Sequence, residues 1–208
     1  MSKRKKPNFA TIHALLSALL VVMPVSGSAG AGQFEDAVGA YDRGDYFTAL
    51  RLLRPLAVQG QASAQYNFGI MYARGQGVQQ DYAEALKWYR RAADQGLAVA
   101  ENNIGQAYYL GQGVPPDEVE AAAWYRKAAE KGNPRSQLNL GVMYDLGKGV
   151  PRNLVEAHKW LSLAISRLSP TDTDGRASAL QGLDQVSAQM TPTQIADAQK
   201  LAREWKPK

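Results

Sequence analysis

Few side chains in this 208-residue sequence could carry catalytic chemistry. Its two histidines are His13 and His158, and it contains no cysteine. Histidine and cysteine supply many of the general bases, nucleophiles and transition-metal ligands of proteins. His13 lies in a segment that we expect to be removed, so no pair of such residues remains. We therefore expect no enzyme activity, no metal site and no cofactor.

The glycine-rich segment from Gly141 to Lys148 resembles a phosphate-binding loop only superficially. Five residues rather than four separate Gly141 from Gly147, and Gly149 stands where such a loop needs Ser or Thr. The motif also requires a preceding strand, whereas the pattern here predicts a helix. We reject phosphate binding at this segment, and we assign the other Gly-x-Gly strings to turns.

The remaining chemistry is hydrogen bonding by asparagines spaced 36 residues apart, each two residues before a glycine. An asparagine side chain donates and accepts at once, which suits an extended polypeptide backbone. Helical spacing places other polar side chains beside them. The alternative is that the asparagines bond the neighbouring repeat and set its stacking. The candidate partner-binding residues are Asn67, Asn103, Asn139, Tyr66, Arg74, Asn102, Gln106 and Arg135.

The asparagines belong to a repeat that runs through most of the chain. A period between 20 and 50 residues indicates supersecondary units that bury their apolar faces only by stacking on one another. The sequence therefore predicts an all-α solenoid of helix pairs. Matching positions include Gly69, Gly105 and Gly141, then Ala85, Ala121 and Ala157, and the Gly-x-Gly-Val strings from Gly75, Gly111 and Gly147.

Each unit is expected to contain a helix A, a glycine turn and a helix B. In the first full unit, helix A should span residues 62–74 and end at Gly75 in a left-handed conformation. Helix B should start after Asp81 in a capping box with Glu84, and the same spacing recurs twice. A glycine inside a helix costs roughly 1 kcal/mol. The repeated glycine at Gly69 and its counterparts therefore predicts a close helix contact.

The two ends of the array depart from the period. Residues 34–60 form a shorter first unit within a solenoid that we place at residues 32–168. Residues 169–208 should add two capping helices, over about 174–189 and 192–204. The second begins with a capping box from Thr191 to Gln194. Its expected buried stripe is Ile195, Ala198, Ala202 and Trp205.

Residues 1–31 have the composition of a secretory signal peptide. Four basic residues precede an apolar run over about 9–25 and a small-residue string that ends at Ala31. We expect cleavage after Ala29 or Ala31 and export to the periplasm or cell envelope, with secretion possible. An uncleaved anchor is the alternative, but His13 interrupts an apolar run shorter than the roughly 20 residues that a membrane span needs.

Cleavage changes the charge of the protein. Removing four of the 24 basic residues and none of the 19 acidic residues leaves a net charge of +1. A nearly neutral chain argues against nucleic acid and anionic membranes as partners. Contact with a membrane is expected only through an uncleaved signal segment, and another protein or peptide remains as the partner.

The repeat pattern resembles the Sel-1-like repeat, a relative of the tetratricopeptide repeat. The resemblance rests on more than a dozen positions per unit over residues 61–96, 97–132 and 133–168, while residues 34–60 look tetratricopeptide-like. It implies a right-handed superhelix whose concave face is lined mostly by A helices, and a role as adaptor or scaffold. The matching string is Ala64-x-x-Asn67-Phe-Gly69-x-Met71-Tyr72-x-x-Gly75-x-Gly77-Val78, continued by Asp81, Ala85, Trp88-Tyr89, Ala92-Ala93 and Gly96.

We therefore expect an exported protein-interaction module that holds a polypeptide on its concave face. The alternative is an exported hydrolase or a peptidoglycan-binding envelope protein on the same fold, because some cysteine-rich relatives are linked to penicillin binding or β-lactamase activity. The Ser-x-x-Lys motif of β-lactamases occurs here once, from Ser2 to Lys5, and no Lys-Thr-Gly accompanies it. The sequence favours the interaction module.

Overall fold

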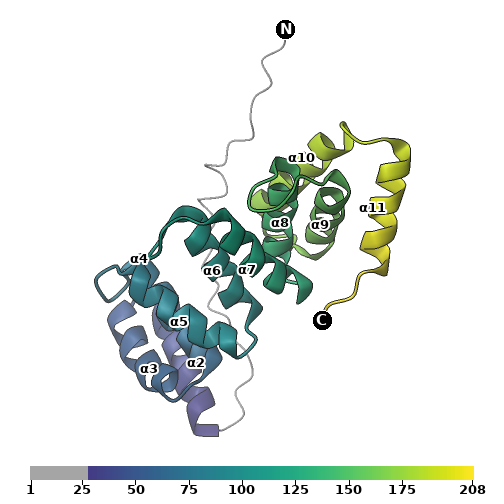
Figure 1. The fold of residues 1–208 in the computed structure, drawn as a ribbon. Coiled ribbons are helices and arrows are strands. Elements are labelled where there is room, and N and C mark those ends of the chain that lie inside the picture. Colours follow the sequence, from purple (N-terminus) through teal and green to yellow (C-terminus); the bar gives the residue numbers. More distant parts are fainter. Residues whose placement is uncertain (1–27) are drawn as a thin grey trace.

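The computed structural model describes residues 28–208, and in that range the chain is all-helical, without strands. Consecutive helices pack as hairpins that follow one another from α2 and α3 to the C-terminal helices (Figure 1). The predicted all-α solenoid is confirmed. The helices are α2 (Ser28–Asp42), α3 (Tyr46–Val58), α4 (Ala62–Arg74), α5 (Tyr82–Asp94), α6 (Ala98–Leu110), α7 (Glu118–Glu130), α8 (Pro134–Leu146), α9 (Leu154–Arg167), α10 (Thr173–Ser187) and α11 (Pro192–Glu204).

The first glycine of each Gly-x-Gly string ends an A helix. Gly75, Gly111 and Gly147 cap α4, α6 and α8 with φ values of 66°, 71° and 68°. Residues with a β-carbon rarely adopt this left-handed conformation, and glycine adopts it freely. The predicted end of helix A is confirmed in all three repeats.

The second glycine lets one repeat approach the preceding one. A β-carbon on Gly113 would lie 2.6 Å from the carbonyl atoms of Tyr82, the first residue of α5. Gly77 lies in the same way against Tyr46 of α3, and Gly149 against Glu118 of α7. Each turn therefore packs on the start of the previous B helix, at a distance that only a bare backbone allows.

The predicted close contact between paired helices is also confirmed. A β-carbon on Gly69 would lie 2.7 Å from Tyr89 Cε1 and 3.2 Å from the Ala85 carbonyl oxygen. At Gly141, the corresponding neighbour is Leu161 Cγ, 2.8 Å away. The B-helix side chain therefore covers the bare backbone of the A helix, and this contact offsets the helix-propensity cost of the glycine.

The predicted capping boxes at the B helices are only half formed: the N-cap side chain accepts a hydrogen bond as predicted, but the glutamate does not bond the N-cap N–H. The Asp81 side chain accepts from the Glu84 N–H, as expected, but the Glu84 carboxylate accepts from Trp88 Nε1 at 3.0 Å. The Asp81 N–H already donates to the Tyr72 carbonyl, so it does not need the glutamate. Asn153 and Glu156 repeat this arrangement, with Glu156 accepting from the Trp160 indole. The box at Thr191 is complete.

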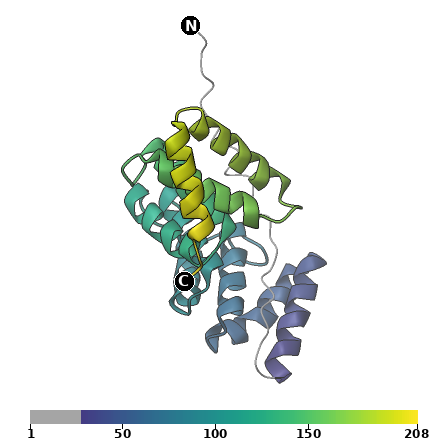
Figure 2. The same cartoon turned by 90° about the vertical axis from the view of Figure 1, so that its right-hand side faces the viewer.

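Both C-terminal helices pack against α9, the last B helix of the repeat array (Figure 2). Ala198 of α11 is fully buried, and Trp205 is partly buried with its ring 6.3 Å from that of Trp160. The Arg167 guanidinium lies 4.4 Å above the Trp205 ring. At the other end, α2 begins at Ser28, before the predicted cleavage positions. The rest of the predicted signal peptide lies outside the described residues.

Candidate functional site

Two pockets lie between successive repeats, and each contains one of the repeated asparagines. We name them the Asn103 pocket and the Asn139 pocket. Both are small and open to solvent. A shift of 36 residues brings most of one lining onto the other. The Asn103 pocket is lined by Ala73, Tyr82, Ala85, Leu86, Tyr89, Asn103, Gln106, Ala107 and Gln112, and the Asn139 pocket by Tyr109, Tyr125, Asn139, Val142, Met143, Leu146 and Lys148.

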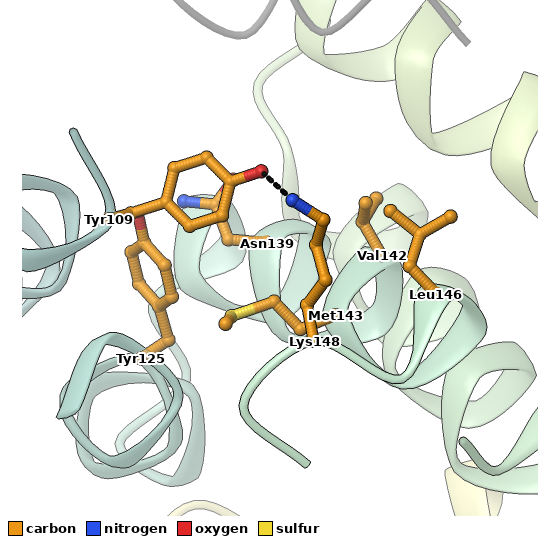
Figure 3. A pocket seen from close by; sticks show the side chains of 7 residues that line it. All are labelled: Tyr109, Tyr125, Asn139, Val142, Met143, Leu146 and Lys148. Atoms are coloured by element: carbon orange, nitrogen blue, oxygen red, sulfur yellow. Dashed lines mark hydrogen bonds between the residues drawn. The ribbon is translucent and has the colours of Figure 1, made fainter. Parts of the chain in front are cut away.

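The Asn139 pocket has apolar walls and a charged rim (Figure 3). Lys148 Nζ donates to the Tyr109 hydroxyl at 3.4 Å and forms an ion pair with Glu118 at 2.9 Å. The Met143 side chain lies between the two tyrosines and the aliphatic side chains of α8. Asn139 is half-buried at this site, so its amide is within reach of a bound group.

In the Asn103 pocket, the asparagine bonds the protein itself. Asn103 Oδ1 accepts from Asn102 Nδ2 at 3.3 Å, and the Asn103 side chain lies close enough to the phenols of Tyr66 and Tyr89 to influence their pKa values. Burial raises the pKa of Tyr66 to about 12 and raises the pKa of Tyr89 as well. Both phenols therefore stay neutral at physiological pH. Asn103 therefore contacts the preceding repeat, as expected if the asparagines set the stacking of the repeats. The rest of its surface lines the pocket.

Asn67 does not face a groove, so the expectation that all three asparagines line one is wrong at this position. Its side chain is fully buried, and neither amide atom has a hydrogen-bond partner among the described residues. The residue that corresponds to Tyr89 one repeat earlier is Leu53, which has no hydroxyl. Leu53 thus stands where a later repeat has a phenol, and Asn67 packs in the core without a hydrogen bond to its side chain among the described residues.

Most other predicted site residues are engaged in interactions within the protein. Tyr66 and Asn102 are buried, and Asn102 Oδ1 accepts from Ser136 Oγ at 2.8 Å. Arg74 donates to the Tyr41 hydroxyl at 2.9 Å. Arg135 forms an ion pair with Asp172 at 2.9 Å. Of the predicted set, Asn103, Gln106 and Asn139 line the pockets.

The structure adds pocket residues that the sequence reasoning missed. Tyr109, Tyr125 and Lys148 line the Asn139 pocket but were not in the predicted set. In the sequence, Lys148 drew attention only as the end of the rejected phosphate-binding segment. A signal was present: Tyr125 has Tyr89 as its counterpart one repeat earlier, beside the same asparagine position.

In the described part of the chain, no three His, Cys, Asp or Glu residues lie close enough to hold a metal ion. His158 lies on α9 and lines neither pocket; burial lowers its pKa, and its Nδ1 lies 3.3 Å from Ser162 Oγ. Within residues 28–208, no helix has the length and apolar character of a membrane span.

Stacked hairpins with regularly spaced inter-repeat pockets define a helical-repeat protein. The family model described as the Sel1 repeat matches residues 62–97, 98–133 and 134–167, which is more than half of the chain. The chain therefore belongs to the Sel1 repeat family. Proteins of this family are generally scaffolds for protein interaction and are typically non-enzymatic.

Two solved structures show the same fold. One is c5321, described as a protective antigen present in uropathogenic Escherichia coli strains and displaying an SLR fold. It is 32% identical with a TM-score of 0.74, and the match covers 86% of this chain and 38% of that one. The chain thus spans well under half of that relative. A Sel1 repeat protein from Oxalobacter formigenes is 27% identical with a TM-score of 0.63, covering 81% of this chain and 74% of that one. No curated protein matches the chain.

Proposed function

We propose that this protein is an exported interaction module that binds a polypeptide partner on the face formed by the A helices α4, α6 and α8. The observation that carries the proposal is the recurrence of one pocket, at Asn103 and again at Asn139. A polypeptide in extended conformation presents side chains at regular intervals. Regularly repeated pockets on one face suit a ligand of that kind.

The chemistry of the pockets supports a peptide rather than a nucleic acid. Both combine tyrosine rings with a half-buried asparagine amide. Ligand sites are commonly apolar with a few placed polar groups that orient the ligand. A nucleic-acid partner would instead call for clustered basic residues, and the chain beyond residue 31 has a net charge of only +1.

The alternative of an exported hydrolase or a peptidoglycan binder has no observation in its favour. The Ser2-to-Lys5 motif lies outside the described residues. At the Asn139 pocket, Lys148 pairs with Glu118, so this lysine is not set up as a general base. A chromogenic β-lactam should not be hydrolysed by the purified protein, and the protein should not pellet with peptidoglycan.

The proposed compartment is the periplasm or cell envelope, on the basis of residues 1–31. Intact-mass measurement on protein isolated from cell fractions tests it. The expected N-terminus is Gly30 or Gly32, in the periplasmic or envelope fraction. A full-length chain confined to the cytoplasm would refute export without bearing on the peptide-binding face.

Site-specific crosslinking tests the binding face itself. A photoreactive residue at Gln106 or at Val142 should capture a partner in cells, whereas one at Lys127 should not. Gln106 and Val142 line the two pockets, and Lys127 is exposed on the B helix α7. The captured partner, once purified, should bind the wild-type protein in calorimetry. It should bind the Asn139→Ala variant more weakly. Capture from Lys127 alone would show that the A-helix face is not the binding surface.

A further inference from the structure

The two pockets differ at four equivalent positions, and the differences change what each can hold. Where the Asn103 pocket has Ala73, the Asn139 pocket has Tyr109. The other three exchanges replace Gln106 with Val142, Ala107 with Met143 and Gln112 with Lys148, again with a 36-residue spacing. The Asn139 pocket therefore lacks the two glutamine amides of its counterpart and keeps only the amide of Asn139.

The Asn139 pocket presents mainly carbon atoms to a bound group. Figure 3 shows Val142 and Leu146 side by side on α8, with the Tyr109 ring across the opening from them. Tyr125 is nearly fully buried beneath Tyr109. An aliphatic or aromatic side chain placed here would remove apolar surface from water on several sides, which favours binding.

The charges at the rim of this pocket are balanced. Lys148 and Glu118 form an ion pair at 2.9 Å, with exposed fractions of 37% and 45% for their side chains. Because the ammonium already has a counter-charge, a neutral side chain can enter without stranding either group. A neutral occupant therefore matches the charge of this site better than an anionic or cationic one.

The Asn103 pocket suits a polar neighbour of that side chain. Gln106 and Gln112 provide amide donors and acceptors, and Asn103 adds a third amide, whose oxygen accepts from Asn102 Nδ2. Amides left without partners on burial cost free energy, so an occupant of this otherwise apolar pocket needs a polar group that bonds the two glutamines.

We propose that the Asn139 pocket is the apolar anchor site of the binding face and takes one large aliphatic or aromatic side chain from an extended partner segment. A polar side chain of the same segment occupies the Asn103 pocket. This inference rests on the proposed function and specifies the partner that the face would select.

The test is selection from a displayed random-peptide library on the purified protein, followed by affinity measurement of the selected peptide. We expect a motif with one large apolar residue. Replacing that residue by alanine should weaken binding to the wild-type protein about tenfold or more. The same replacement should hardly affect binding to Val142→Gln, which gives the Asn139 pocket the amide of its counterpart.

Lys127→Gln is the control, because Lys127 is exposed on α7 and lines neither pocket, so this variant should keep the affinity for the selected peptide. Gln106→Val, at the position equivalent to Val142 one repeat earlier, should select a second apolar residue in its own library experiment. Thermal unfolding followed by circular dichroism establishes that all three variants remain folded. Affinity should also vary by less than about threefold between low and high salt, since the anchor is neutral.

The outcomes separate the two proposals. If peptides are selected but bind Val142→Gln as tightly as wild type, or if their affinity falls steeply with salt, the anchor site is refuted and the peptide-binding face stands. If the wild-type protein selects no peptide and crosslinking from the A helices captures nothing, both fail.

Discussion

Gly105 lies directly against the ring of Tyr125. A β-carbon on Gly105 would be 2.7 Å from Tyr125 Cδ1 and 2.8 Å from Cε1. Both distances are shorter than van der Waals contact, so the ring can pack on α6 only because the helix has no side chain at this point. The same relationship joins Gly69 to Tyr89 in the preceding repeat.

Gly105→Leu should lower the free energy of unfolding by about 1 to 3 kcal/mol, because the added side chain overpacks this contact. Urea denaturation measures the effect. Gly182→Ala is the control. Gly182 lies inside α10, and a β-carbon there would be 3.4 Å from the Leu161 side chain of α9, which is an ordinary van der Waals distance. That variant should keep its stability or gain slightly from helix propensity. Wild-type stability in Gly105→Leu would contradict the close contact.

Asn103→Ala and Asn139→Ala should behave differently although the two residues are equivalent in the repeat. Removing Asn103 takes away the acceptor of the buried Asn102 amide and the amide that lies beside the phenols of Tyr66 and Tyr89. Leaving buried polar groups unpaired costs about 1 to 3 kcal/mol. Asn139→Ala should change stability little and weaken partner binding. Thermal unfolding and calorimetry of both variants check this, and equal loss of stability in the two would show that Asn139 is also structural.

Stability should fall on mild acidification because of His158. Burial lowers its pKa below the ordinary value of 6.5, so the unfolded chain binds the proton more readily than the folded one. The stabilising effect of the neutral imidazole is therefore present above the ordinary pKa and is lost as pH drops below it. Urea midpoints between about pH 7 and about pH 5 should decrease more for wild type than for His158→Gln. Parallel curves for the two proteins would exclude His158 as the cause.

Trp205→Ala should destabilise the C-terminal end of the array by about 2 kcal/mol, because the ring packs on Trp160 and beneath Arg167. Deleting residues 206–208 is the control. It removes the ion pair between Lys208 and Glu130, whose lysine is 74% exposed, and exposed pairs contribute less than about 1 kcal/mol. Hydrogen exchange in α9 should increase in the first variant and not in the second.

Much of the fold follows from the spacing of small residues in the sequence. Gly75 and its counterparts predict where each A helix ends, because only glycine adopts the left-handed conformation there without strain. Gly69 and its counterparts predict where paired helices touch. Both inferences needed only a local backbone rule and the period, and the structure confirms both.

The environment of each asparagine could not be obtained in the same way. Asn67, Asn103 and Asn139 share a position in the repeat, yet their surroundings depend on residues from a neighbouring hairpin. Where the preceding hairpin offers Leu53, Asn67 is fully buried, and where it offers Tyr89, Asn103 is half-buried and lines a pocket. Equivalence in a repeat specifies backbone position, whereas hydrogen bonding depends on side chains that vary between repeats.

Gly113 and Gly149 pack on the first residues of α5 and α7, which occupy equivalent positions in successive hairpins. Each unit consequently presents to the next one a packing surface of the same shape. An additional 36-residue segment inserted between two existing units would meet a matching surface on either side. Duplication or loss of a whole unit would therefore leave the packing between the remaining units intact.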